Sequence, residues 1–159
     1  MRVSKAGCLV LLAACGEPIE EDPFVFNAME LEVHNQINAY RVSQGLNELE
    51  LDPAIGEVSR VHSQDMLKGR VPFGHDGFDG RVTTIQFTID AWELGENVAW
   101  NEGYDDPATT AVEGWIASPP HHENILAEWN LTGIGCAGIG CKGEPLGPLY
   151  FTQIFVWTP

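Results

Sequence analysis

The chain has 159 residues, enough for one folded domain, and 44% of them are hydrophobic, with five Trp among them. This composition predicts a packed core and excludes global disorder. No stretch approaches the roughly 20 apolar residues that a membrane helix needs. Eight Lys and Arg face 23 Asp and Glu, so the net charge is −15 at pH 7. Because such a surface repels phosphate backbones, we expect no nucleic-acid partner.

Residues 1–14 are predicted to be the signal peptide of a lipoprotein. Arg2 and Lys5 precede a short apolar run that ends in Leu12-Ala13-Ala14-Cys15, and small residues before a cleavage point are typical of an export signal. The cysteine at this place resembles a bacterial lipobox, which implies cleavage before Cys15 and a diacylglycerol on its sulfur. The alternative is an ordinary signal peptide that contains Cys15. We therefore expect an exported protein, either anchored in the bacterial envelope through this lipid or secreted.

Residues 15–27 are predicted to be an acidic tether that leads to a folded domain over residues 28–159. The segment from Gly16 to Pro23 contains four acids, two Pro and almost no apolar residues. A segment of this composition cannot bury enough apolar surface to fold.

The cysteine count agrees with an exported protein. Cys8 is lost with the signal peptide and Cys15 carries the lipid, which leaves Cys136 and Cys141 as an even pair in an oxidising compartment. The four residues between them include two Gly and suit a hairpin tip, so we predict a disulfide that contributes about 2 kcal/mol. Two free thiols are the alternative. A zinc site is disfavoured here because no His or further Cys lies nearby in the sequence.

Four helices and three strands are predicted from the spacing of apolar residues and from capping residues. The helices run from about Ala28 to Gln44, from Asp52-Pro53 to Lys68, from Asp106-Pro107 to near Ser118, and from Pro120 to Ala127. A loop rich in Gly and Asp follows the second helix, from Pro72 to Gly80. The strands contain residues 92–100, Ile134 with Cys136, and residues 149–157, the last apolar on both faces. We therefore predict an α+β fold, a three-layer α–β–α sandwich with a central antiparallel sheet.

Glu96 is a carboxylate on an apolar face. Alternation along its strand places it on the same face as Leu94, Val98 and Trp100, where a charge is costly unless it is paired. Lys and Arg are few and mostly placed at helix ends, so we expect histidines as partners. The candidates are His75 in the glycine loop, His121 in the short helix four residues before Ile125, and His62 on the inner stripe of the second helix.

Two interpretations of Glu96 stay open. In the first, Glu96 and one His form a buried hydrogen-bonded pair that only fixes the loops. In the second, His75, His121 and Glu96 line a cleft, where they could hold zinc as three ligands with an open water position or serve in general acid–base catalysis. Their spacing is too loose to decide, and no His-Glu-x-x-His motif, nucleophile elbow or phosphate loop occurs.

The string Gly95-Glu96-Asn97-Val98-Ala99 resembles the hallmark of the CAP superfamily, which comprises cysteine-rich secretory proteins, antigen 5 and group 1 pathogenesis-related proteins. Further matches to bacterial members follow in order, in residues 35–41, 62–66, 73–77, 115–121, 124–126, 133–135 and 150–155. Together they cover roughly residues 28–157. The resemblance implies an α–β–α sandwich, in agreement with the fold predicted from the pattern.

The resemblance also implies a cleft. His75 and Glu96 match one His and one Glu of the family's two His and two Glu. Ser118 stands at the position of the second Glu and Tyr150 at that of the second His, so only half of the set is present. Bacterial relatives are similar in having a His at the position of His121. We expect His62, Asn97, Ser118 and Tyr150 to line the cleft.

We predict two functions of different classes from these residues. The first is a binding module, exported and lipid-anchored, that holds a small lipid-like ligand or a protein partner. The second is a hydrolase, peptidase-like, in which Glu96 is the base and His75 and His121 hold zinc or water. A structural envelope protein without a cleft function is the remaining alternative.

Overall fold

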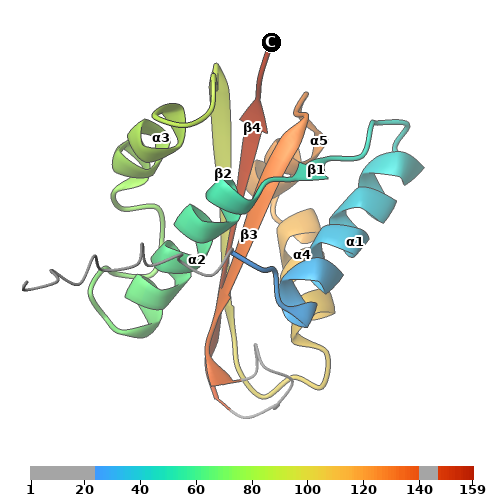
Figure 1. The fold of residues 1–159 in the computed structure, drawn as a ribbon. Helices are drawn as coiled ribbons and strands as arrows, with labels where there is room; N and C mark the ends of the chain where they lie inside the picture. The colour runs from blue at the N-terminus through green and yellow to red at the C-terminus, as the bar shows by residue number, and fades with distance from the viewer. Residues whose placement is uncertain (1–23, 140–146) are drawn as a thin grey trace, which may run out of the picture.

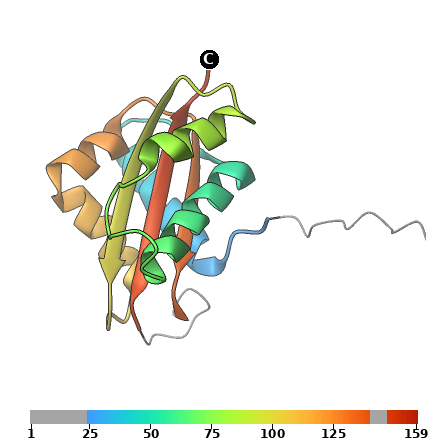
Figure 2. The ribbon, with the colours of Figure 1, turned by 90° about the vertical axis from the view of Figure 1, so that its left-hand side faces the viewer.

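A four-stranded sheet lies between two helical layers in the computed structural model, which describes residues 24–139 and 147–159 (Figure 1). The helices are α1 (Ala28–Ser43), α2 (Pro53–Leu67), α3 (Phe78–Gln86), α4 (Pro107–Ala117) and α5 (Pro119–Leu126). The strands are β1 (Glu50–Leu51), β2 (Glu93–Asn101), β3 (Leu131–Ala137) and β4 (Leu149–Trp157). Helices α2 and α3 cover one face of the sheet and the other three helices cover the opposite face (Figures 1 and 2). The predicted α–β–α sandwich is confirmed.

The strand order is β1-β3-β4-β2, which places β4 in the centre as its two apolar faces predicted. The pairs of β4 with β2 and with β3 are antiparallel. In contrast, β1 pairs in parallel with β3 over two residues, so the sheet is mixed and the prediction of an antiparallel sheet holds only for its three long strands. A strand of two residues is too short to show an alternating pattern in the sequence.

Helices α2 and α4 begin where Asp52 and Asp106 predicted, and α1 begins at Ala28 as its apolar spacing predicted. The side chains of Asn27, Asp52 and Asp106 accept hydrogen bonds from backbone amides of the first turns of α1, α2 and α4. Helix α3 was not predicted, because it begins at Phe78 inside the expected loop and buries one apolar residue, Ile85. Gly77 precedes it with φ of 78°, a left-handed conformation that glycine adopts without strain.

The larger hydrophobic core lies between the sheet and the layer of α1, α4 and α5, and includes Val33, Ile37, Val112, Trp115, Ile125, Phe151 and Phe155. A smaller core of Ile55, Ile85, Ala91, Ile154 and Val156 lies under α2 and α3. The helical layer on this second face therefore needs further contacts to stay in place.

Helix α2 approaches β3 very closely, and two glycines allow it. A Cβ atom at Gly133 would lie 2.2 Å from the backbone nitrogen of Gly56, and one at Gly135 would lie 2.0 Å from that of Arg60. The hydroxyls of Ser59 and Ser63 donate hydrogen bonds to the carbonyl oxygens of the same two glycines, at 3.1 and 2.9 Å. This contact fixes α2 close to the sheet, on the face that carries Glu96.

The first described residues already belong to the packed domain. The guanidinium of Arg60 lies 3.9 Å from the ring centre of Phe24 and donates a hydrogen bond to the carbonyl of Val25. Ordered packing thus begins four residues before the expected boundary at residue 28. The signal peptide, Cys15 and Cys141 lie outside the described residues, so the predicted lipid anchor and the disulfide of Cys136 stay predictions. Among the described helices, none is both long and apolar enough to cross a membrane.

Candidate functional site

The carboxylate of Glu96 is the centre of the site. Glu96 lies on β2 opposite Ile154 of β4, on the face covered by α2 and α3, and its side chain is only 1% exposed. An ionised carboxylate at such a place needs several hydrogen-bond donors to replace the water that it lost. The sequence analysis anticipated this need.

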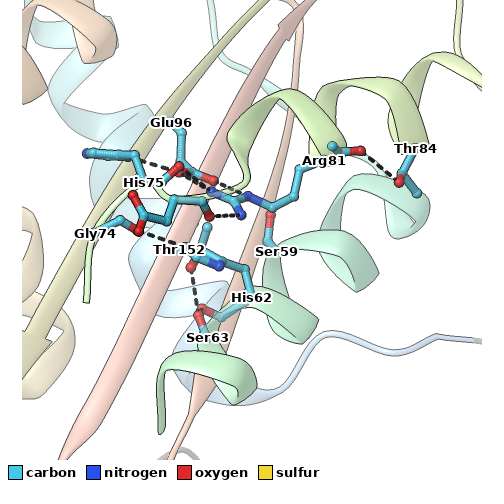
Figure 3. A network of polar contacts seen from close by, with 12 residues as sticks. Ser59, His62, Ser63, Gly74, His75, Arg81, Thr84, Glu96 and Thr152 are labelled. Carbon is cyan, nitrogen blue, oxygen red and sulfur yellow. Dashed lines mark hydrogen bonds and ion pairs between the residues drawn. The ribbon is translucent and has the colours of Figure 1, made fainter. Parts of the chain in front are cut away.

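The main partner of Glu96 is Arg81, which reaches down from α3 (Figure 3). Its Nε donates to Oε2 and its Nη2 donates to Oε1, both at 2.7 Å, so the ion pair is bidentate. The same guanidinium donates to the carbonyls of His75 and Asp76 at 3.3 and 3.0 Å. Arg81 therefore ties together β2, α3 and the loop that precedes α3.

His75 is the second partner of Glu96. Its Nδ1 lies 2.9 Å from Oε1, and because a carboxylate only accepts, Nδ1 must carry the hydrogen. The neutral ring then has its lone pair on Nε2. The side chain is 48% exposed, so solvent or a ligand can reach the ring.

His62 lies beside this cluster on α2 and is buried. Its Nε2 donates to the carbonyl of Gly74 at 2.9 Å, which holds the glycine loop against α2. Burial lowers the pKa of His62 below its ordinary value of 6.5, and the positive charge of Arg81 lowers the pKa further. The histidine is therefore neutral at pH 7, with an acceptor at Nδ1.

His121 approaches the cluster from α5, on the other side of the edge strand β2. The centres of the His75 and His121 rings lie 6.2 Å apart, and the side-chain amide of Asn97 donates to the backbone carbonyl of His121 at 3.0 Å. Burial lowers the pKa of His121, and the neighbouring His75 lowers it further. The structure thus places His121 beside His75, which in turn contacts Glu96.

The other expected cleft residues are more dispersed. Asn97 is buried and faces α5, where its Oδ1 accepts a hydrogen bond from Asn124. Ser118 joins α4 to α5, and its carbonyl accepts from the amide of His122. The ring of Tyr150 lies 6.3 Å from that of Phe73, toward the far end of the sheet. Among the described residues, no hydrogen bond or ion pair joins the side chains of these three residues to the carboxylate of Glu96.

The three residues predicted to bind zinc do not fit that role as they are arranged. Both oxygens of Glu96 already accept hydrogen bonds, two of them from the positive guanidinium of Arg81. A zinc ion at this carboxylate would have to displace that cation. Within residues 24–139 and 147–159, no group of three or more His, Cys, Asp and Glu side chains is placed to hold a metal ion.

A pocket of 630 Å³ lies beside Arg81, between α2, α3 and the loop that joins them. It is lined by Glu57, Val58, Val61, His62, Asp65, Val71, Asp76, Gly77, Gly80, Arg81 and Thr84. Of the residues that the sequence analysis assigned to a cleft, His62 alone is part of this lining. The site thus consists of the Glu96 cluster and of a pocket that shares His62 and Arg81 with it.

Arg81 is not among the predicted partners of Glu96, because the segment up to Gly80 is rich in Gly and Asp and indicates a loop, and because histidines were the expected partners. One signal was available. Arg81 lies four residues before Ile85, so in a helix both side chains face the same way, toward the sheet. A helix beginning at Phe78 would have placed a cation over Glu96.

Residues 34–155 match the model of the cysteine-rich secretory protein family. The chain is 34% identical to the uncharacterized protein YkwD of Bacillus subtilis, over a match that covers 71% of this chain and 43% of the relative. The chain therefore spans less than half the length of that relative.

Solved structures share the fold. An extracellular protein with an SCP domain from Bacillus anthracis has a TM-score of 0.65 at 23% identity, and the match covers 82% of this chain and 40% of that one. An outer surface protein of Borrelia burgdorferi has a TM-score of 0.64 at 18% identity, over 82% of this chain and 93% of that one. At these identities the likeness concerns the fold alone.

The ion pair of Arg81 with Glu96 generates the first prediction. Arg81→Met leaves a buried carboxylate without its cation, and we expect the free energy of unfolding to fall by about 3 kcal/mol. Arg81→Met combined with Glu96→Leu should lose much less, because no charge is then left buried. Urea denaturation followed by Trp fluorescence measures both values.

The matched control is Arg70→Met. Arg70 pairs with Asp65 at 2.9 Å, but its side chain is 63% exposed, so its loss should cost less than about 1 kcal/mol. The Arg81→Met and Glu96→Leu variants are also measured singly. If the double variant loses as much free energy of unfolding as the two single variants together, the proposed coupling of Arg81 with Glu96 is contradicted.

The lowered pKa of His62 generates the second prediction. In the unfolded chain His62 takes up a proton near pH 6.5, whereas in the folded chain its pKa is lower. Acidification below about pH 6.5 should therefore destabilise the protein. His62→Gln keeps a donor for Gly74 without a titrating group. Its free energy of unfolding should therefore fall less than that of the wild type between about pH 7 and pH 5.5, by up to about 1.4 kcal/mol per pH unit. Equal pH dependence of the two proteins would contradict the assignment.

Proposed function

Because the chain belongs to the cysteine-rich secretory protein (CAP) family, we propose that it is an exported binding domain that holds a small, partly apolar ligand. The observation that carries the proposal is the pocket between α2 and α3. Its 630 Å³ falls within the roughly 300–1,000 Å³ of small-molecule sites. Three valines, Val58, Val61 and Val71, supply apolar lining, and a few charged and polar groups surround them.

The Glu96 cluster supports this function by holding the pocket open in one shape. Arg81 belongs to the lining and is fixed by the buried carboxylate of Glu96, and His62 belongs to the lining and is fixed by Gly74. A wall that is held by such contacts loses little conformational entropy when a ligand binds. The cluster then acts as a support for the binding site and needs no chemistry of its own.

Export and anchoring complete the proposal. Leu12-Ala13-Ala14-Cys15 supports a lipid on Cys15, and the acidic segment after it supports a tether that holds the binding domain near the membrane surface of the cell envelope.

A hydrolase is the second candidate, and the contact of His75 with Glu96 is the observation that favours it. The contact fixes the ring with its lone pair on Nε2, so His75 would be the base and Glu96 would orient it. Glu96 itself is a poor candidate for the base because its two oxygens accept three hydrogen bonds. In a hydrolase of this kind, His75→Gln would lower the turnover of peptide substrates by about a hundredfold or more. Binding in the pocket, which His75 does not line, would be unchanged.

The binding function is tested by filling the pocket. Short-chain alkyl amines, alcohols and carboxylates are titrated into the full chain, and amide signals of α2 and α3 are followed by NMR. We expect at least one of these probes to shift the pocket signals, and Val61→Trp to weaken that binding by about tenfold or more, because the larger side chain takes up the apolar space.

Val42→Trp is the control, because Val42 on α1 is as exposed as Val61, at 52% against 51%, and lies outside the pocket. If no probe shifts the pocket signals, or if Val61→Trp binds as well as Val42→Trp, the proposed function is wrong.

Anchoring is tested by Cys15→Ser. We expect the wild-type protein in the membrane fraction of a bacterial host and the variant in the soluble fraction or unprocessed, because serine cannot receive the lipid through a thioether. Cell fractionation with immunoblotting measures the distribution. An unchanged distribution would rule out the lipid anchor and leave the binding function standing.

A further inference from the structure

The pocket between α2 and α3 has an uneven supply of hydrogen-bonding groups. Its polar side chains are those of Glu57, His62, Asp65, Asp76, Arg81 and Thr84. Three of these are carboxylates, which only accept hydrogen bonds, and three carry donors. The class of ligand depends on which of these groups are still free to bind it.

Most of the donors are already committed within the protein. Four of the five N–H groups of Arg81 donate to Glu96, Asp76 or His75, and Glu96 balances its charge. The hydroxyl of Thr84 donates to the carbonyl of Gly80 at 3.0 Å. The Nε2 of His62 donates to Gly74. Among these three side chains, one N–H on Nη1 of Arg81 is therefore left for an anionic ligand.

The acceptors, in contrast, remain available. The carboxylates of Glu57 and Asp76 make no hydrogen bond or ion pair within the part of the chain that the structure describes, and both residues are exposed at the pocket. Asp65 pairs only with the exposed Arg70. Neutral His62, which is 97% buried, has its remaining acceptor at Nδ1, and no described residue donates to this atom.

From this imbalance we infer that the ligand is a small organic cation, an ammonium or guanidinium group on a short apolar chain. The inference rests on the binding function proposed above. The valines accommodate the apolar chain, the carboxylates of Glu57 and Asp76 attract the charge, and the acceptors receive its N–H groups. Glu96 offsets the opposing charge of Arg81, because it pairs with the guanidinium across two hydrogen bonds of 2.7 Å.

The test compares n-butylammonium, n-butanol and n-butyrate, which share an apolar chain and differ in charge. Each is titrated into the full chain at pH 7.5, where His62 is neutral, and dissociation constants are taken from the NMR shifts of the α2 and α3 amides. We expect n-butylammonium to bind about tenfold more tightly than n-butyrate, with n-butanol between them.

Asp76→Asn should weaken the binding of n-butylammonium by about fivefold and leave that of n-butanol unchanged, because it removes charge and keeps size. The carbonyl of Asp76 that accepts from Arg81 is retained in this variant. Asp105→Asn is the control, since it removes the same charge from an exposed residue outside the pocket.

Two results would overturn the inference. If n-butyrate or n-butanol binds the pocket as tightly as n-butylammonium, the pocket does not select cations, although the binding function stands. If Asp105→Asn weakens the binding of n-butylammonium as much as Asp76→Asn does, the preference for cations reflects the charge of the whole molecule and not this pocket. If no probe binds in the pocket, the proposed binding function itself is wrong.

Discussion

The ion pair of Glu96 with Arg81 ties α3 to the sheet. On the opposite face, α1, α4 and α5 share a large core with the sheet, whereas α3 buries only Ile85 against it. Arg81 supplies the contacts that α3 lacks, to β2 through Glu96 and to the preceding loop through two carbonyls. A small apolar area and a bidentate charged pair together position a helix that neither would hold alone.

The same pair decides which chemistry the site can perform. A carboxylate that accepts three hydrogen bonds, two of them from a cation, is poorly disposed to take a proton or to bind a metal ion. What remains free is the exposed ring of His75 and a pocket beside Arg81 that His75 does not line. The proposed binding function uses the pocket, and the alternative hydrolase uses the ring, so the two are separable by substitution.

Much of the fold could be predicted because its signals are local. Asp52-Pro53 and Asp106-Pro107 mark the starts of two helices by capping alone, and the alternation of β2 placed Glu96 on an apolar face and demanded a partner for it. The identity of that partner is a tertiary property. It depends on how α3 docks, and the apolar stripe of Phe78, Val82 and Ile85 on α3 begins inside a Gly- and Asp-rich segment that indicates a loop, while β1 is too short to show a pattern. The pocket was likewise out of reach, since it depends on how the unpredicted helix α3 packs against α2.

The central claim is that Glu96 fixes α3 and the preceding loop through Arg81, and hydrogen–deuterium exchange of the backbone amides tests it most directly. Glu96→Gln removes the charge with little change in shape. The account predicts that amides of residues 78–86 then exchange about tenfold or more faster, while those of α4, which packs on the other face, keep their protection. Unchanged protection of α3 in the variant would show that the helix is held by other contacts and would contradict the account.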